Sequence, residues 1–485
     1  MSFGSALGRR CRSKTAAVLI ALALTGCAGP SFVDMERDEV FAAAVEASLD
    51  ERSSYASAAA YSYFRGANVD DPRYDRAMRL LALNSERMGF SYAASLWYLE
   101  IARARRDVAL VSEAVLGLER VMSTYPHDRS MLVRGFIATA EITGLPPRQQ
   151  AFVAYHQGLD SVLRGLDDWA DSQFAQIPSG SEYALRARYV QLMRLVSAYE
   201  LDEAIVEIEA LLEEKNIPED LRLEAQRTLA RVDFERARWD DALERYETLR
   251  QSAPDDPSLL LEMAWTHYYR GEYQRALGLL LALDAPSYGG LIAPERYLLE
   301  ALSLQKLCQF EPAQRAAVRL RIRHGDAIDD LYNGVPLRQS VALRNAARQR
   351  NEGQDVARYR ARLARERVMI DEMEGELGKE LADGLRAVYD RGLQEAARRE
   401  DAELERVMVA VGDDLLAAEE GVRLILHELG VSLLRGRRND PGEPERILTT
   451  ERFDPQNEVQ YLFEGEFWTD ELDDIVVRVE DRCID

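Results

Sequence analysis

Apolar positions follow a helical spacing along most of the chain, and small and aromatic residues repeat on top of that spacing at a fixed interval. Within residues 225–285, three pairs of positions lie 34 residues apart: Ala237 and Gly271, Trp239 and Tyr273, and Ala242 and Ala276. Such an interval is the period of a repeat built from two helices and a turn. The alanine marks the place where the two helices cross, because a larger side chain would push them apart.

The crossing alanine can be followed through a longer part of the chain. Ala170, Ala204, Ala242, Ala276 and Ala313 are spaced by 34, 38, 34 and 37 residues. The departures from 34 fall at predicted turns, where a helical array tolerates insertions. We therefore expect a helical array over residues 146–334 and a degraded version of it over residues 35–145.

The central part of this array resembles the tetratricopeptide repeat (TPR). The matching residues are Leu229, Ala230, Trp239, Ala242, Tyr246 and Pro254 in one repeat, and Met263, Ala264, Gly271, Tyr273 and Ala276 in the next. The resemblance implies a solenoid that binds proteins along the face lined by the first helix of each repeat. On that face lie the candidate partner-binding residues Arg227, Arg231, Phe234, Trp265, Tyr268 and Tyr269.

These residues suit an extended peptide. The arginines would bind its carboxylates, and the aromatic side chains would hold its apolar side chains. The alternative is that the aromatic side chains belong to the core between repeats.

The chain changes character after residue 334. Residues 335–435 contain few helix breakers and carry apolar residues at a spacing near 3.5, which predicts either a hairpin folded back on the solenoid or a coiled coil that forms a homodimer. Interruptions at Gly375, Gly384, Gly392 and Gly412 favour the hairpin. Residues 436–485 begin with a polar linker, and the alternating pattern from residue 457 to residue 483 predicts a small β-hairpin. The expected fold is thus all-α apart from this tail.

Residues 1–26 have the organisation of an export signal. Basic residues precede an apolar run from Ala16 to Leu24 that is too short to span a bilayer. The sequence Leu24-Thr25-Gly26-Cys27 resembles a bacterial lipobox, which implies cleavage before Cys27 and acylation of Cys27 with palmitate and related chains. In lipoproteins of this kind, Ala28 after the cysteine favours the outer membrane, and residues 27–34 would be the tether. The alternative is an ordinary secretory signal.

The charge of the chain excludes one class of partner. The net charge is −23, and loss of the signal, which holds four basic residues and no acidic ones, would make it more negative still. Phosphate backbones require a basic patch, so we expect no nucleic-acid partner. The acylated N-terminus would be the only attachment to the membrane.

Candidate chemistry is sparse in this sequence. The five histidines are scattered, and no motif of a nucleophile, a phosphate loop or a metal site is present. We expect no catalytic residues, no metal and no cofactor, and therefore no enzyme activity. Cys308 and Cys483 remain after export; in an oxidising periplasm they either pair or stay as separate thiols.

The lipobox and the repeats together resemble the TPR outer-membrane lipoproteins of Gram-negative bacteria. More weakly, Ser91 to Asp107 and the stretch FEGEFWTDEL at residues 463–472 are similar to myxobacterial TPR lipoproteins associated with gliding motility. The resemblance implies a periplasmic scaffold that binds envelope proteins for motility, secretion or barrel assembly. Two alternatives stay open: a cell-wall enzyme or its regulator, and a pilotin-like chaperone of an outer-membrane subunit.

Overall fold

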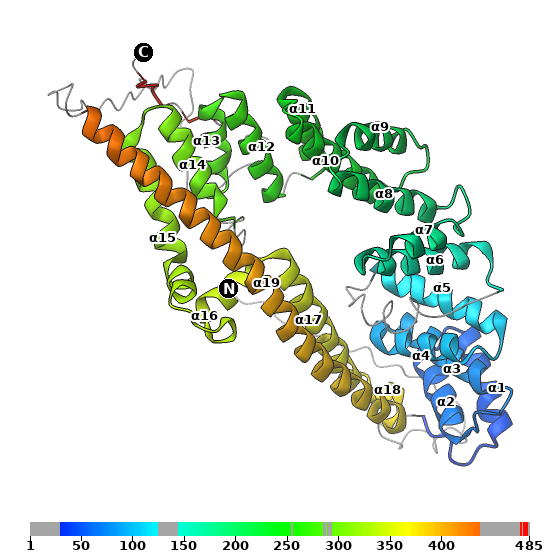
Figure 1. Cartoon of the computed structure of the whole chain (residues 1–485). Helices are drawn as coiled ribbons and strands as arrows, with labels where there is room; N and C mark the ends of the chain where they lie inside the picture. Colours follow the sequence, from blue (N-terminus) through cyan, green and yellow to red (C-terminus); the bar gives the residue numbers. More distant parts are fainter. Residues whose placement is uncertain are drawn as a thin grey trace, which may run out of the picture. The chain divides into compact units, whose positions relative to one another are not determined.

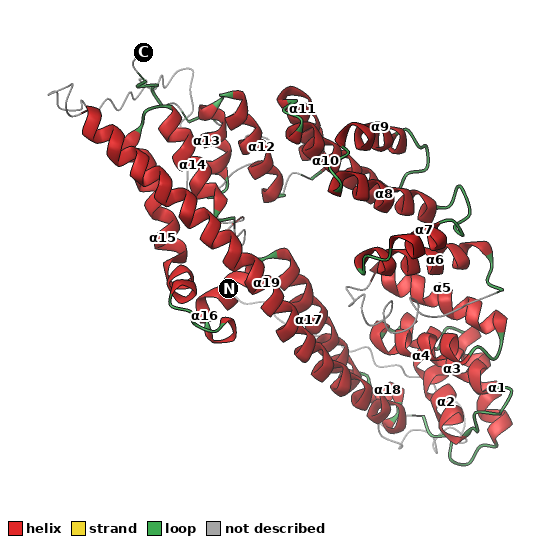
Figure 2. Ribbon diagram, in the orientation of Figure 1, coloured by secondary structure: helices red, strands yellow, loops and turns green. Residues whose placement is uncertain are grey.

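The computed structural model describes residues 30–124, 144–253, 256–284, 288, 293–436, 476–477 and 479–483. The regular structure within these ranges is entirely helical (Figures 1 and 2). None of the described helices is long and apolar enough to cross a membrane. The chain divides into two compact units, one made of Met1–Tyr125 with Arg362–Leu393 and the other of Pro126–Ala361 with Gln394–Asp485.

The first unit contains five successive helices and part of a long hairpin. The five helices are α1 (Arg37–Leu49), α2 (Ser53–Gly66), α3 (Tyr74–Arg87), α4 (Ser91–Ala104) and α5 (Val108–Thr124). The hairpin consists of α17 (Asn351–Glu372), the short α18 (Glu374–Leu377) and α19 (Lys379–Gly436).

The second unit contains the longer series of helices and the rest of α17 and α19. Its helices are α6 (Pro147–Leu163), α7 (Asp167–Phe174), α8 (Glu182–Ser197), α9 (Leu201–Leu212), α10 (Glu219–Glu235), α11 (Trp239–Ser252), α12 (Pro257–Arg270), α13 (Tyr273–Ala282), α14 (Glu295–Lys306), α15 (Phe310–Tyr332), the 3₁₀ turn η4 (Leu337–Gln339) and α16 (Val341–Gln349).

One local rule generates the helix pairs of both units. In the seven pairs whose two helices are both described, the fourth residue of the second helix is a fully buried alanine: Ala56, Ala94, Ala170, Ala204, Ala242, Ala276 and Ala313. Five residues before each alanine, the turn contains a residue with positive φ: Glu51, Gly89, Gly165, Tyr199, Ala237, Gly271 and Cys308. The predicted TPR-like array is therefore confirmed, and Ala56 and Ala94 extend its rule to the first unit.

The long helical segment forms a hairpin within the chain. Arg367 of α17 pairs with Asp390 of α19 at 2.9 Å in the first unit, and Arg360 pairs with Glu400 at 2.8 Å in the second. The apolar stripe that a coiled-coil dimer would use is buried inside the chain: Leu363, Ile370, Leu377, Leu381 and Leu385. Of the two alternatives left open by the sequence, the structure has the hairpin.

Gly384 and Gly392 of α19 are places of close approach rather than interruptions. A Cβ atom built on Gly384 would lie 2.1 Å from the hydroxyl of Tyr61 on α2, and one on Gly392 would lie 2.6 Å from the ring of Tyr92 on α4. Both glycines are helical, so the helix continues through them. Glycine is needed at these positions because a tyrosine ring occupies the space of the missing side chain.

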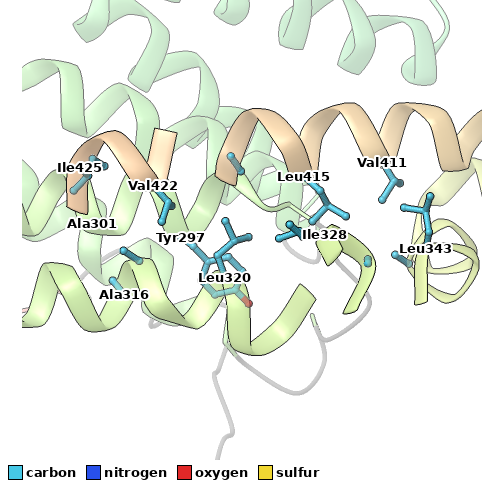
Figure 3. Close-up of a cluster of buried hydrophobic side chains, with 14 of the residues drawn as sticks. Tyr297, Ala301, Ala316, Leu320, Ile328, Leu343, Val411, Leu415, Val422 and Ile425 are labelled. Carbon is cyan, nitrogen blue, oxygen red and sulfur yellow. The ribbon is translucent and has the colours of Figure 1, made fainter. Parts of the chain in front are cut away.

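In the second unit, α19 covers α14, α15 and α16 with aliphatic side chains (Figure 3). Val411, Leu415 and Val422 of α19 belong to one buried cluster with Leu320 and Ile328 of α15. A solenoid must cover the apolar face of its last repeat to remain soluble. Here α19 of the same chain covers that face.

The β-hairpin predicted for the tail is not found among the described residues. Most of the predicted range lies outside them, and residues 476–477 and 479–483 form no strand. The main chain of this segment instead bonds to helices: Val477 N–H donates to the carbonyl of Gln274, and Arg482 N–H donates to that of Leu307. The alternating pattern predicted a strand, because every second side chain of a strand is buried. The same pattern suits an extended segment that lies on helices, so alternation does not distinguish the two.

Candidate functional site: an aromatic cluster on α10–α13

The aromatic residues predicted for partner binding come together in the structure. We call the following six side chains the Tyr269 cluster: Phe234, Trp239, Trp265, Tyr268, Tyr269 and Tyr273. Tyr269 lies in the middle, stacked on Trp239 with ring centroids 5.1 Å apart and planes at 12°. Its ring also stacks on Trp265, with centroids 6.0 Å apart and planes at 27°.

Local sequence explains how the cluster forms. Trp265, Tyr268 and Tyr269 are at positions i, i+3 and i+4 of α12, so they share one face of that helix. The turn at Ala237 brings Phe234, near the end of α10, to 5.1 Å from Trp239, which begins α11. The sequence pattern identified Trp239 as a repeat position, and the predicted binding residues did not include it. Its position one repeat before Tyr273 was the available signal.

The cluster joins the core to the solvent. Phe234, Trp265 and Tyr268 are partly buried and pack against the apolar core of α10–α14, whereas Tyr269 is 52% exposed. The two interpretations offered by the sequence, core and binding surface, thus apply to different members of the cluster. The core holds the ring of Tyr269 in place, so a partner would pay little entropy to order it.

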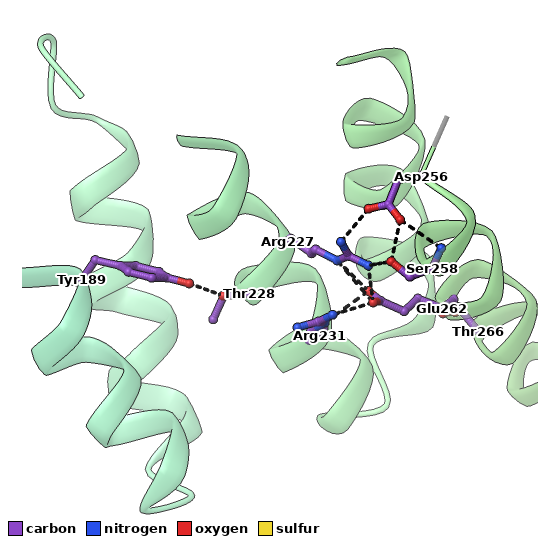
Figure 4. Close-up of polar contacts among 8 residues, drawn as sticks. All are labelled: Tyr189, Arg227, Thr228, Arg231, Asp256, Ser258, Glu262 and Thr266. Carbon is purple, nitrogen blue, oxygen red and sulfur yellow. Dashed lines mark hydrogen bonds and ion pairs between the residues drawn. The ribbon is translucent and has the colours of Figure 1, made fainter. Parts of the chain in front are cut away.

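The two predicted arginines are held by carboxylates of the neighbouring repeat (Figure 4). Arg227 pairs with Asp256 and with Glu262, each at 2.7 Å, and Arg231 pairs with Glu262 at 2.6 Å. Burial lowers the pKa of Arg227, but the two carboxylates outweigh it and leave the pKa raised. Arg227 therefore fastens α10 to the start of α12, while the side chain of Arg231, 57% exposed, still faces solvent.

The predicted binding residues did not include Glu262, which is the partner of both arginines. Glu262 follows Arg227 by 35 residues and Arg231 by 31, which are close to one repeat length. Residues about one repeat apart lie on adjacent first helices, so opposite charges at this interval were a usable signal. A similar contact joins α8 to α10, where the hydroxyls of Tyr189 and Thr228 lie 2.8 Å apart (Figure 4).

Glu295 marks the edge of the open aromatic surface. Burial and the nearby carboxylate of Asp414 on α19 raise its pKa, and a hydrogen bond with Trp265 opposes that rise. Asp414 is paired with Arg350, which lies between α16 and α17. Beyond Glu295, α19 covers α14, whereas Arg231 on α10 and Tyr269 on α12 remain exposed.

The remaining candidate residues concern cysteine chemistry and metals. Cys308 and Cys483 form a disulfide, with their Cα atoms 5.1 Å apart, whereas Cys27 lies outside the described residues. In the part of the chain that the structure describes, no group of three or more His, Cys, Asp or Glu side chains is arranged to hold a metal ion.

Comparisons with known proteins return solved structures only. No family model matches the chain, and no curated protein does. The chain is similar to a tetratricopeptide repeat protein from Parabacteroides merdae (14% identity, 59% of this chain and 92% of that chain), to the TPR domain of P58(IPK) (12%, 83% and 99%) and to the Cut9–Hcn1 hetero-tetramer of the APC/C (10%, 81% and 96%), each with a TM-score of 0.22. Scores this low carry no argument of their own, and the TPR-like description of this chain rests on its own helix pairs.

Proposed function

We propose that this protein is a non-catalytic scaffold that binds an extended segment of a partner protein on the Tyr269 cluster. The observation that carries the proposal is the half-exposed ring of Tyr269, stacked between Trp239 and Trp265 and supported by the core beneath them. Rigid aromatic side chains at the centre of a surface are typical of binding hot spots. A partner residue with an apolar side chain would bury the exposed edge of Tyr269.

The surroundings of the cluster suit a narrow, extended partner. Two charged groups lie near the cluster: the guanidinium of Arg231, which pairs with Glu262, and the carboxyl group of Glu295, which hydrogen-bonds with Trp265. Because Arg227 and Glu262 are already paired, the aromatic contacts would supply most of the affinity and the nearby charges would add specificity. Extended peptides use this combination of anchors.

The proposed location is the periplasmic face of the outer membrane, with the protein held by acyl chains on Cys27. The lipobox-like sequence supports this location. The disulfide between Cys308 and Cys483 supports export, since such bonds persist in oxidising compartments. The partner would then be an envelope protein of a motility, secretion or barrel-assembly machine, with gliding motility the more specific candidate.

The test of partner binding is a pull-down from solubilised envelopes with Tyr269→Ala. Tyr332→Ala on α15 is the matched control, because Tyr332 is 53% exposed and lies outside the cluster. We expect wild type and Tyr332→Ala to recover the same envelope proteins and Tyr269→Ala to lose them, while circular dichroism shows all three folded. Equal recovery by all three proteins would rule out the cluster as the binding surface.

The test of location is Cys27→Ser expressed in cells labelled with palmitate. We expect the variant to lose the label and to leave the outer-membrane fraction, because Cys27 is the residue that would carry the acyl chains. A Cys27→Ser protein that still fractionates with the outer membrane would contradict the lipid anchor without affecting the binding proposal.

A further inference from the structure

The described C-terminal residues, 476–477 and 479–483, lie against the start of α13 and the turn between α14 and α15. Gln274 on α13 makes two bonds to it: its carbonyl accepts from Val477 N–H at 3.2 Å, and its side-chain amide donates to the carbonyl of Val479 at 2.6 Å. The side-chain amide of Gln309 donates to the carbonyl of Glu480 at 2.6 Å. These bonds engage the main chain of the segment, so they do not depend on its side chains.

Two aliphatic side chains of these residues, two positions apart, face the protein. Val477 and Val479 pack against the apolar cluster of α14, α15 and α19, whereas Val476 is 43% exposed. Main-chain bonds combined with partly buried side chains two positions apart are one way in which proteins recognise extended peptides. The surface beneath the segment therefore has the properties of a peptide-binding site that the chain fills itself.

We propose that this surface, the tail site, is a second peptide-binding site, distinct from the Tyr269 cluster. The tail site consists of Gln274, Leu307, Gln309 and the apolar side chains beneath Val477 and Val479. It accepts an extended segment of a partner protein that carries two aliphatic residues two positions apart. The tail of this chain occupies the site until it is displaced.

The disulfide makes the tail a strong competitor. Cys308 lies between Leu307 and Gln309, so its bond to Cys483 fastens the tail at the site itself. A tethered segment competes at an effective concentration of roughly millimolar, which a free partner in dilute solution does not match. Reduction by a dithiol would open the tether: the S–S bond accepts two electrons and two protons to give two thiols, and the dithiol becomes a disulfide.

The experiment is a fluorescence anisotropy titration of a labelled peptide with the sequence of residues 475–482, which contains no cysteine. The full mature chain is used in its oxidised form, in its dithiothreitol-reduced form and as Cys483→Ser. The double variant Val477→Asp, Val479→Asp removes the apolar side chains of the tail from the site without shortening the chain, and Val476→Asp is its matched control because Val476 is 43% exposed.

We expect the oxidised wild type and Val476→Asp to bind the peptide weakly. Reduction and Cys483→Ser should each strengthen binding by at least about tenfold, since each opens the disulfide that holds the tail at the site. The double variant should act in the same direction, because it removes the two apolar side chains with which the tail competes. If every form binds the peptide no better than a scrambled peptide of the same composition, the tail site is not a peptide-binding site. Because the substitutions lie in the tail and none lies in the Tyr269 cluster, failure here leaves the pull-down result unaffected.

Discussion

Two neighbouring regions of the second unit are built from the same kind of helix pair but differ in the side chains on their surface and in what covers them. In the aromatic region, α10–α13, the exposed face carries the Tyr269 cluster and paired charges. In the covered region, α14–α16, the buried side chains are mostly aliphatic and pack against residues 404–429 of α19. The crossing alanine is the same in both, as Ala242 and Ala276 in one and Ala313 in the other.

The difference shows that the repeat determines how the helices pack, but not which side chains lie on their outer face or what covers that face. Aliphatic side chains gain only from exclusion of water, so the covered region needs a permanent partner, which α19 provides. The fit is close: a Cβ on Gly421 of α19 would lie 2.9 Å from Leu298 of α14. Tyrosine and tryptophan tolerate contact with water, so the aromatic region can stay open until a partner arrives.

The largest expected effect is on the covered region. Leu415 is fully buried between α19 and α15, and Leu415→Ala should lower the free energy of unfolding by about 2–5 kcal/mol, because it removes apolar burial and leaves a cavity. Urea denaturation followed by circular dichroism measures this change. Leu424→Ala is the control on the same helix, since Leu424 is 62% exposed and should change stability by less than about 0.5 kcal/mol. Equal effects from the two would mean that α19 does not cover α14–α16.

A smaller effect distinguishes two histidines, the partly buried His324 of the covered region and the buried His267 of the aromatic region. In the covered region, burial together with nearby Arg323 and Arg296 lowers the pKa of His324 to about 4. In the aromatic region, burial also lowers the pKa of His267, but a 2.7 Å hydrogen bond with Glu272 opposes the shift. His324 should therefore make the fold more sensitive to acid than His267 does.

The direction of this pH dependence follows from proton binding. An unfolded histidine binds its proton near pH 6.5, so between about pH 4 and 6.5 the unfolded chain holds more protons than the folded one, and stability falls as the pH drops. After allowance for solvent at the partly exposed ring, we expect His324 to contribute ~1 kcal/mol to this fall. Urea denaturation of His324→Gln at pH 6.5 and at pH 4.5 should show a smaller fall than wild type. A larger change in His267→Gln would reverse the comparison.

The smallest effect concerns the turns, which unlike the surfaces are alike in the two regions. Ala237 and Gly271 in the aromatic region and Cys308 in the covered region all have positive φ. Ala237→Gly should raise stability by about 0.5 kcal/mol, because relief of a left-handed alanine outweighs the greater freedom of glycine in the unfolded chain. The reverse change one repeat later, Gly271→Ala, should lower stability by about 1 kcal/mol. Thermal unfolding measures both, and changes of the same sign would contradict the shared turn.

Several features of this protein could be predicted from its sequence. The helix pairs follow from a periodicity close to 34 residues, and the crossing alanines follow from the need for close packing. The aromatic face of α12 follows from the spacing of Trp265, Tyr268 and Tyr269. All these features depend on residues within one or two repeats of each other, and such contacts leave a regular pattern along the chain.

Other features depend on contacts between distant segments. The cover of α15 by α19 brings together residues about 90 positions apart, as in the pair of Arg321 and Glu419, which are separated by 98. The tail joins α13 and α15 across 175 residues between Cys308 and Cys483. An apolar stripe predicts that a helix is covered, but it does not predict which segment covers it. The sequence thus determined the repeats and the aromatic face, whereas only the tertiary structure decided which faces α19 and the tail would occupy, because those choices depend on how distant surfaces fit together.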